Sequence, residues 1–221
     1  VKKVAIEAFQ NVRRSGLIAI RLKNGDELEW VKPTSGKDDV ILASREGQSI
    51  RCHEDDIRSM GRVAAGVRGM RLRKGDVIVG MGIVPAHKGP KGPKLDFHLL
   101  VITEHGYGKR TSVSQYKVQR RGGSGMKTVS VTPKTGKLVT AMVVALDDPA
   151  LEGAKQDVLA GSTKGQVIRV PLKSVSVLGR ATQGVRIMRF KEEGEQVANA
   201  TVIASATEEE TGKSDSKQKE S

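Results

Sequence analysis

Short apolar runs separated by glycine-containing turns recur along most of the chain. Three of them read VILAS (40–44), HLLVIT (98–103) and VLAGS (158–162), and each ends close to a glycine. Runs of this length, rich in Val, Ile and Leu and bounded by turn residues, are typical of β-strands. No stretch keeps a helical apolar period for long. The pattern therefore predicts an all-β protein.

A second kind of segment alternates apolar and basic residues. When extended, GLIAIRL (16–22), GVRGMRL (66–72) and GVRIMRF (184–190) place Leu, Ile or Met on one face and Arg on the other. NGDELEW (24–30) and KGDVIVG (74–80) carry Asn-Gly or Gly-Asp pairs, which favour tight turns between strands. We expect strands in all five segments, joined by such turns.

The chain repeats itself with a period of 59 residues. A Ser or Thr, two residues, Gly, three residues and Arg occur in that order three times. The aligned glycines are Gly47, Gly106 and Gly165, and the aligned arginines are Arg51, Arg110 and Arg169. A fixed period of this size indicates an architecture of repeated supersecondary units.

A second repeated unit, here called a box, follows each of these copies. Box 2 is GRVAAGVRGMRL (61–72), box 3 is RRGGSGMKTVSV (120–131) and box 4 is GRATQGVRIMRF (179–190); box 1, VRRSGLIAIRL (12–22), is a weaker copy. The aligned box glycines are Gly16, Gly66, Gly125 and Gly184, at intervals of 50, 59 and 59 residues. The first interval is shorter because the loop inside it is shorter than the loops at 85–96 and 147–157.

About four strands in each repeat of roughly 50–60 residues indicate blades of a propeller-like array. We place the repeats at about 1–58, 59–118, 119–177 and 178–206. The polar segment TEEETGKSDSKQKES (207–221) is expected to be a disordered tail. The chain has no initiating methionine and begins inside a repeat, so we expect it to be a fragment.

The charge of the chain points to a polyanionic partner. The formal net charge is +13 and the sequence pI is about 10.0, while residues 205–221 carry −2, which leaves +15 on the rest. Such an excess favours nucleic acid, against the alternative of a basic protein that its charge merely keeps soluble. Aromatic residues make up only 3% of the chain, which disfavours a platform that stacks single-stranded bases.

The sequence lacks the residues that several other functions would need. Cys52 is the only cysteine, so an intrachain disulfide and a cysteine-built zinc site are excluded and a reducing compartment is expected. The four histidines (His53, His87, His98 and His105) show no metal-ligand spacing and are predicted to be surface or turn residues. No apolar run is long enough to span a membrane, no phosphate-loop spacing occurs, and no nucleophile, base and acid form a recognisable set.

Cations recur at equivalent positions and are the candidate binding residues. One set is Arg14, Arg62, Arg121 and Arg180; a second is Arg21, Arg71 and Arg189, which has no basic counterpart in box 3; a third is Lys2, Arg51, Arg110 and Arg169. Arg68, Lys109, Lys127 and Arg186 add to these. On a disc, equivalent residues lie at equivalent places on the rim. We therefore expect a basic track that contacts phosphates by counterion release, with weak sequence preference.

The chain resembles the C-terminal domain of the DNA gyrase A protein. The resemblance rests on QRRGGSG (119–125), ITEHGYGKRTSVSQY (102–116), MGRVAAGVRGMRL (60–72) and LGRATQGVRIMRF (178–190), and it extends to about residue 204. It implies a six-bladed β-pinwheel that wraps DNA on its basic perimeter, of which this chain would be the third to sixth blades. It also implies a role in ATP-dependent negative supercoiling.

The resemblance places catalysis elsewhere. Cleavage in that family uses a tyrosine in the N-terminal part of the gyrase A protein, and Tyr107 and Tyr116 are not in that context. ATP and Mg²⁺ are implied for the holoenzyme but bind outside this chain, for which no cofactor is expected. The implied partners are double-stranded DNA, a second gyrase A protein and the gyrase B protein (A2B2), with no membrane, in the bacterial cytoplasm and associated with the chromosome.

The sequence departs from the family in its hallmark box. That box is close to QRRGGKG and belongs to the first blade, whereas here QRRGGSG stands in the third aligned repeat with Ser124 in place of the lysine. Its residues, Gln119, Arg120, Arg121, Gly122, Gly123, Ser124 and Gly125, are predicted to be one of several phosphate-gripping loops. Two alternatives stay open: the equivalent domain of the topoisomerase IV A protein, which favours decatenation or relaxation, and a propeller that binds proteins.

Overall fold

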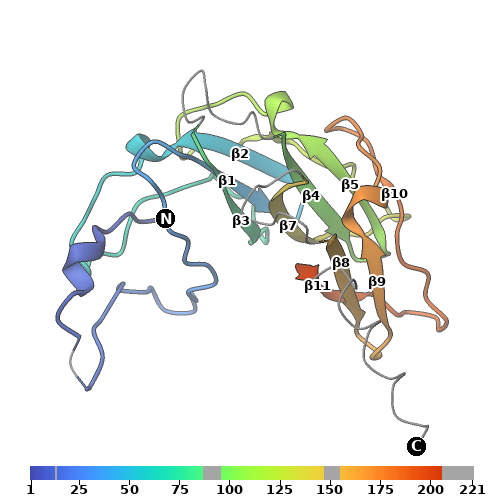
Figure 1. The fold of residues 1–221 in the computed structure, drawn as a ribbon, viewed down its shortest axis with the longest axis horizontal. Helices are drawn as coiled ribbons and strands as arrows, with labels where there is room; N and C mark the ends of the chain where they lie inside the picture. The colour runs from blue at the N-terminus through green and yellow to red at the C-terminus, as the bar shows by residue number, and fades with distance from the viewer. Residues whose placement is uncertain (13, 87–95, 147–154, 206–221) are drawn as a thin grey trace, which may run out of the picture.

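The computed structural model describes residues 1–12, 14–86, 96–146 and 155–205. Within them the chain forms three antiparallel sheets that follow one another along an arc, starting from an irregular N-terminal segment (Figure 1). The helical turns of this part of the chain are all of the 3₁₀ type: η1 Ile6–Phe9, η2 Glu54–Asp56, η3 Val113–Gln115 and η5 Leu172–Ser174. The prediction of an all-β protein is confirmed.

The sheets have four, four and three strands among the described residues. The first has the order β3-β1-β2-β6, with β1 Asp39–Ser44, β2 Gln48–His53, β3 Ile78–Val84 and β6 Met126–Lys127. The second has the order β10-β5-β4-β7, with β4 Phe97–Thr103, β5 Tyr107–Ser112, β7 Leu138–Ala145 and β10 Val185–Arg186. The third has the order β11-β8-β9, with β8 Lys155–Ser162, β9 Val167–Pro171 and β11 Val197–Ser205. Blades of about four strands are confirmed.

The first two sheets take an outer strand from a box further along the chain. β6 belongs to box 3 and pairs with β2, so that Met126 lies opposite Ser49. β10 belongs to box 4 and pairs with β5, so that Val185 lies opposite Gly108. The sheets therefore run across the repeat limits drawn from the sequence, and each of these boxes ties one sheet to the next.

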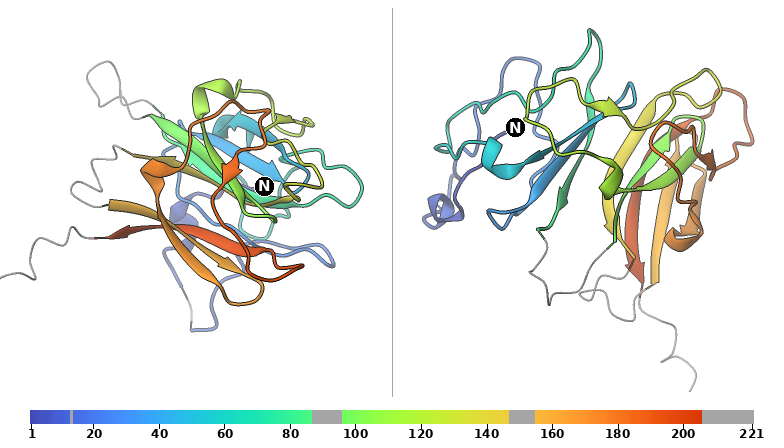
Figure 2. Two further views of the ribbon diagram at one scale, coloured as in Figure 1. Left: turned by 90° about the vertical axis from the view of Figure 1, so that its right-hand side faces the viewer. Right: turned by 90° about the horizontal axis from the view of Figure 1, so that it is seen from above.

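The apolar core lies in layers between successive sheets, which stand side by side in Figure 2. On β4, Leu99 and Val101 belong to the layer shared with β1, and Leu100 and Ile102 belong to the layer shared with β8. A strand buried on both faces needs an uninterrupted apolar run, which explains HLLVIT. Burial of one such side chain contributes about 1.5–3 kcal/mol, so β4 holds the arc together.

Three of the predicted strands are wrong. In the described part of the chain no strand lies in 14–22, 24–30 or 66–72. An extended segment becomes a strand only where a neighbour completes its hydrogen bonds. Toward the N-terminal segment, box 2 shares backbone hydrogen bonds with one residue, Val1. Val67 and Val1 each donate to the carbonyl of the other (2.8 Å in both directions). Alternation in one segment does not report whether a second strand lies beside it.

The tight turns are confirmed. The N–H of Asp26 donates to the carbonyl of Lys23 (3.1 Å), and the N–H of Asp76 donates to the carbonyl of Arg73 (3.1 Å). Gly25 and Gly75 are the third residues of these turns and have φ of 74° and 78°. Most of the predicted loops, at 87–95 and 147–154, and the predicted tail lie outside the described residues.

Candidate nucleic-acid interface

The loop of sequence QRRGGSG that leads into β6 is fixed by its backbone. The N–H of Gln119 donates to the carbonyl of Arg51 on β2 (2.7 Å). The N–H of Gly122 donates to the carbonyl of Gly69 in box 2 (2.6 Å). The loop is therefore anchored both to the first sheet and to the preceding box.

The repeated box glycines lie where two backbones touch. A Cβ atom on each would stand 2.3–2.7 Å from a carbonyl oxygen of an earlier repeat: Gly66 from Val1, Gly125 from Ser49 and Gly184 from Gly108. All three have a positive φ, of 91°, 73° and 85°. Only glycine combines this conformation with so close an approach. The glycine period of the sequence therefore marks the places where a box contacts the backbone of an earlier repeat.

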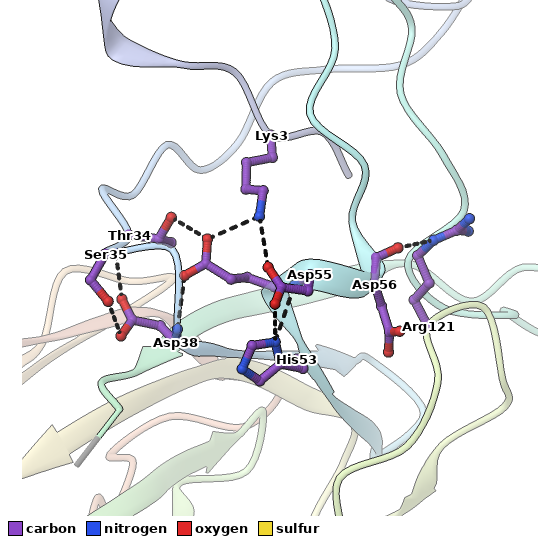
Figure 3. Close-up of polar contacts among 9 residues, drawn as sticks. Lys3, Thr34, Ser35, Asp38, His53, Asp55, Asp56 and Arg121 are labelled. Carbon is purple, nitrogen blue, oxygen red and sulfur yellow. Dashed lines mark hydrogen bonds and ion pairs between the residues drawn. The ribbon is translucent and has the colours of Figure 1, made fainter. Parts of the chain in front are cut away.

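Arg121, the second arginine of the QRRGGSG loop, fixes this loop by hydrogen bonds to backbone carbonyls. Arg121 donates from Nε to the carbonyl of Asp56 (2.7 Å), as Figure 3 shows, and from Nη1 to the carbonyl of Arg68 (3.2 Å). In box 4, Arg180 donates from Nη1 to the carbonyl of Lys127 (2.9 Å). Both side chains are half-buried. In boxes 3 and 4 this arginine therefore binds a backbone carbonyl of the box before it.

We expect Arg121 to stabilise the fold and Arg120 to act only at the surface. The Arg121→Ala variant leaves two carbonyls without their donor and should lower the free energy of unfolding by about 1–2 kcal/mol. The Arg120→Ala variant removes an exposed side chain that has no hydrogen bond or ion pair with the described residues, so its change should stay within about 0.5 kcal/mol. Urea titration measures both, and equal losses would contradict the assignment.

Arginines of the third predicted set brace the sheets. Two form ion pairs within their own sheet, Arg51 with Asp39 (2.7 Å) and Arg169 with Asp157 (2.6 Å). Arg110 is only 4% exposed and donates from Nε to the carbonyl of Val175 (2.9 Å). Arg51 and Arg110 therefore face the protein and not the solvent, whereas Arg169 is exposed.

The N-terminal member of this set is Lys3 in the structure, which corrects the placement of Lys2. Arg51 forms a parallel bridge with Val118, Arg110 with Val177, and Lys3 with Ser59. Lys3 also lies 3.3 Å from the buried carboxylate of Glu54, in the polar cluster of Figure 3. The shortened first repeat shifts an alignment based on sequence spacing by one residue.

Lys2 and Lys109 are caged by backbone oxygens. Lys109 is fully buried, and its Nζ donates to the carbonyls of Gly179 (2.6 Å) and Arg180 (2.6 Å) and to the hydroxyl of Thr182 (3.0 Å). Lys2 makes the equivalent contacts with box 2, at the carbonyls of Arg62 and Ala64, and also with Ala19. Burial lowers the pKa of Lys109 to about 8 and also lowers the pKa of Lys2. Both amines position a box and do not reach a surface ligand.

Three cations at one position of successive boxes face the solvent, and we call them the basic stripe. Arg68, Lys127 and Arg186 each stand two residues after a box glycine, 59 residues apart, and all three are exposed. Lys127 and Arg186 lie on the outer strands β6 and β10. Arg186 donates to the hydroxyl of Tyr107 (2.9 Å). The anchored boxes thus set basic side chains at regular places on the outer edge of the sheets.

The remaining predicted cations lie around the stripe or on the N-terminal segment. Arg14, Arg21, Arg71, Arg120 and Arg189 are exposed, and Arg62 is half-buried. The N–H of Arg71 donates to the carbonyl of Gly123 (2.8 Å), which brings Arg71 to the QRRGGSG loop. Ser124, at the position of the family's lysine, is exposed on the same loop.

Comparison with known proteins identifies the family. The sequence profile described as DNA gyrase C-terminal domain, beta-propeller, matches residues 1–35, 38–85, 98–145 and 156–204. The chain belongs to this family. Two curated DNA gyrase A proteins are similar to it: one from Staphylococcus epidermidis is 36% identical over 190 residues, and one from Staphylococcus aureus is 35% identical over 211 residues.

The gyrase relatives are much longer than this chain. The matches cover 86% and 96% of the chain but only 20% and 22% of the two relatives, so the chain spans about a fifth of their length. A crystal structure of the C-terminal domain of DNA topoisomerase IV has a TM-score of 0.77 at 21% identity, covering 92% of this chain and 58% of that one. A structure of the DNA gyrase A C-terminal domain has a TM-score of 0.64 at 24% identity, covering 85% and 58%. The shared fold is a β-propeller of the gyrase C-terminal type.

The structure adds one basic residue to those predicted from the sequence and corrects the predicted position of a histidine. Lys134, which no repeat signalled, lies 5.7 Å from the ring centre of Tyr107, on which Arg186 also lies (5.1 Å). His98 is buried on β4 and not at the surface, because that strand is covered on both faces. His87 lies outside the described residues.

The described part of the domain shows no reactive thiol, metal-binding cluster or membrane-spanning helix. Cys52 is buried, and burial raises the pKa of its thiol to about 11, so it stays protonated near neutral pH. Among the described residues no group of three or more His, Cys, Asp or Glu side chains is arranged to hold a metal ion. The same residues contain no helix long and apolar enough to cross a membrane.

Proposed function

We propose that this chain binds and wraps duplex DNA on its basic outer edge, as part of a DNA gyrase A protein. The observation that carries the proposal is the basic stripe: Arg68, Lys127 and Arg186 repeat at one exposed position of three successive boxes. Phosphates recur regularly along DNA, and a repeated cation matches a repeated charge irrespective of sequence. Membership of the gyrase C-terminal family and the charge of the chain support the same function.

The arc of sheets suits a bent duplex. Bending a site of 20–30 base pairs costs on the order of 1–6 kcal/mol, and contacts from several boxes offset that cost. The described residues contain no α-helix that could read base edges in a groove. Binding should therefore show little sequence preference.

In the holoenzyme this wrapping would direct strand passage for ATP-dependent negative supercoiling. ATP and Mg²⁺ would bind outside this chain, and the assembly would contain two gyrase A and two gyrase B proteins on the bacterial chromosome. The equivalent role in topoisomerase IV is the second candidate, because a topoisomerase IV domain shares the fold with a TM-score of 0.77. Relaxed plasmid, ATP and the full-length parent enzyme decide between them, since only gyrase produces negative supercoils.

Wrapping by the chain itself can be tested on nicked plasmid. Ligation in the presence of the protein, followed by its removal, converts wrapped DNA into a change of linking number. We expect the topoisomer distribution to shift progressively with protein concentration and to return to its original position in high salt, where phosphate contacts are screened. Binding at saturation without a shift would show that the chain coats DNA but does not wrap it.

A further inference from the structure

Tyr107 differs from the residue that the repeat otherwise places beside a cation of the basic stripe. On β5, Tyr107 lies directly opposite Arg186 of β10. Gln48 has the equivalent position opposite Lys127 in the first sheet, and Gln166 stands 59 residues after Tyr107 in the third sheet. Glutamine therefore satisfies the fold at this position twice, so the fold does not by itself require the ring of Tyr107.

Lys134 is a second departure from the repeat. It stands nine residues after the glycine of box 3, where box 2 has Gly75 and box 4 has Glu193. The turn that carries Lys134 is fixed, because the N–H of His105 donates to the carbonyl of Thr135 (3.0 Å). His105 lies in the hairpin between β4 and β5. The turn therefore holds Lys134 beside the start of β5.

The two departures meet at one aromatic ring. Nζ of Lys134 lies 5.7 Å and Cζ of Arg186 lies 5.1 Å from the ring centre of Tyr107. Arg186 also donates from Nη2 to the hydroxyl of Tyr107 (2.9 Å). The negative face of an aromatic ring attracts cations, so one ring restricts both side chains. Tyr107 is only 5% exposed, whereas both cations face the solvent.

These two cations have no carboxylate partner in the part of the chain that the structure describes, where no ion pair includes Lys134 or Arg186. Glu104 accepts from the N–H of Lys137, just after the turn (2.8 Å), but its ion pair is with Arg45 (2.7 Å). Like charges that share one ring repel each other, and an anion that contacts both would offset this repulsion. The guanidinium and the ammonium have more N–H donors than one phenol can accept, so both keep donors for a phosphate.

We propose that Tyr107 is a positioning residue for DNA binding, which holds Lys134 and Arg186 together as a preformed clamp for phosphates of the duplex. The inference rests on the proposed function and deepens it, because it sets one point of the basic stripe apart from the others. Lys127, opposite Gln48, has no such ring beside it. A side chain that is already fixed loses less conformational freedom on binding, which is worth about 2- to 12-fold in affinity for each flexible side chain.

Replacing the ring without changing the charge tests the clamp. Tyr107→Gln introduces the residue that stands at the equivalent position of the other two sheets and keeps both cations. We expect the full 221-residue chain with this change to bind duplex DNA about tenfold more weakly at about 0.1 M salt. Gln48→Ala is the matched control, since Gln48 also lies opposite a stripe cation but offers it no ring, and it should leave the affinity within about twofold. Fluorescence anisotropy of a labelled duplex measures both.

A double-mutant cycle separates positioning from support of the fold. In a protein that already carries Lys134→Ala and Arg186→Ala, Tyr107→Gln has no cation left to hold and should weaken binding by no more than about twofold. Urea titration confirms that each variant is folded under the binding conditions. If Tyr107→Gln does not fold, the cycle is run with Tyr107→Phe, which keeps the ring and loses only the hydroxyl that binds Arg186. Its expected loss is about threefold in the unchanged background and none where Arg186 is alanine.

The outcomes distinguish the clamp from the proposed function. A loss of affinity that disappears once both cations are alanine supports the clamp. An equal loss in both backgrounds would show that Tyr107 only supports the fold, and clear but unchanged binding by the Tyr107 variant would show that the ring positions nothing for DNA. Either result overturns the clamp and leaves the proposed function standing. Absence of duplex binding by the unchanged chain at low salt would overturn both.

Discussion

Replacing Arg68, Lys127 and Arg186 together by alanine is expected to weaken the binding of duplex DNA by about 10²- to 10³-fold at about 0.1 M salt. These three exposed cations are the basic stripe of boxes 2, 3 and 4. Each phosphate contact contributes about 0.9 to the slope of log affinity against log salt, so the triple variant should lose close to 3 from that slope. A salt titration of binding to duplexes of unrelated sequence measures both quantities.

The control removes the same charge from elsewhere. Lys23, Lys32 and Lys37 are exposed on the N-terminal segment, outside the three sheets. Their replacement by alanine lowers the net charge equally, and we expect it to leave the slope within about one contact of the unchanged protein. An equal loss of slope in both triple variants would show that DNA responds to net charge and not to the stripe.

Replacing Lys109 by methionine is expected to destabilise the fold by about 1–3 kcal/mol. The side chain is fully buried and serves the carbonyls of Gly179 and Arg180 and the hydroxyl of Thr182. Methionine fills the space but leaves the carbonyl of Arg180 without its donor, whereas the carbonyl of Gly179 still accepts from the N–H and the hydroxyl of Thr182. One buried unsatisfied group costs about 1–3 kcal/mol. Urea denaturation measures the loss, and Lys127→Met, on an exposed side chain, should change stability by less than about 0.5 kcal/mol.

The pH dependence of this difference has a definite sign. Burial lowers the pKa of Lys109 from 10.5 in the unfolded chain to about 8 in the folded one. Below about 8 the amine is charged in both states, and between about 8 and 10.5 only the unfolded chain keeps the proton. Stability therefore rises with pH in that window, and the neutral amine still has two N–H groups for the two carbonyls. We expect the gap between the unchanged protein and Lys109→Met to widen there; a narrowing gap would contradict the lowered pKa.

The repeated elements were predictable because each is written several times. The runs at 40–44, 98–103 and 158–162 lie within β1, β4 and β8, because their apolar residues can be buried only in a sheet. Box 1 and box 2 show the limit, since their alternation fits a strand but neither contains a strand among the described residues. A strand forms only when a second segment completes its hydrogen bonds, and the sequence of one segment does not show whether that partner is present.

The cations of the candidate site show the same limit of sequence-based prediction. Repetition of Arg121 and Arg180, or of Arg51 and Arg110, shows that the fold needs these side chains at fixed places, and either a phosphate or a backbone carbonyl would explain that need. The structure resolves the choice, because these guanidinium groups donate to carbonyls of neighbouring repeats. Lys127 breaks the arginine pattern, yet it stands exposed at the equivalent position to Arg68 and Arg186.

By itself the sequence determined the all-β class, the 59-residue period, the basic charge and the family, since composition and spacing depend on the order of residues alone. Only the tertiary structure decided which cations brace the sheets and which face the solvent. It also revealed that the glycines of boxes 2, 3 and 4 are contact points between backbones. Burial and pairing arise between residues far apart in the chain, so no local pattern carries them.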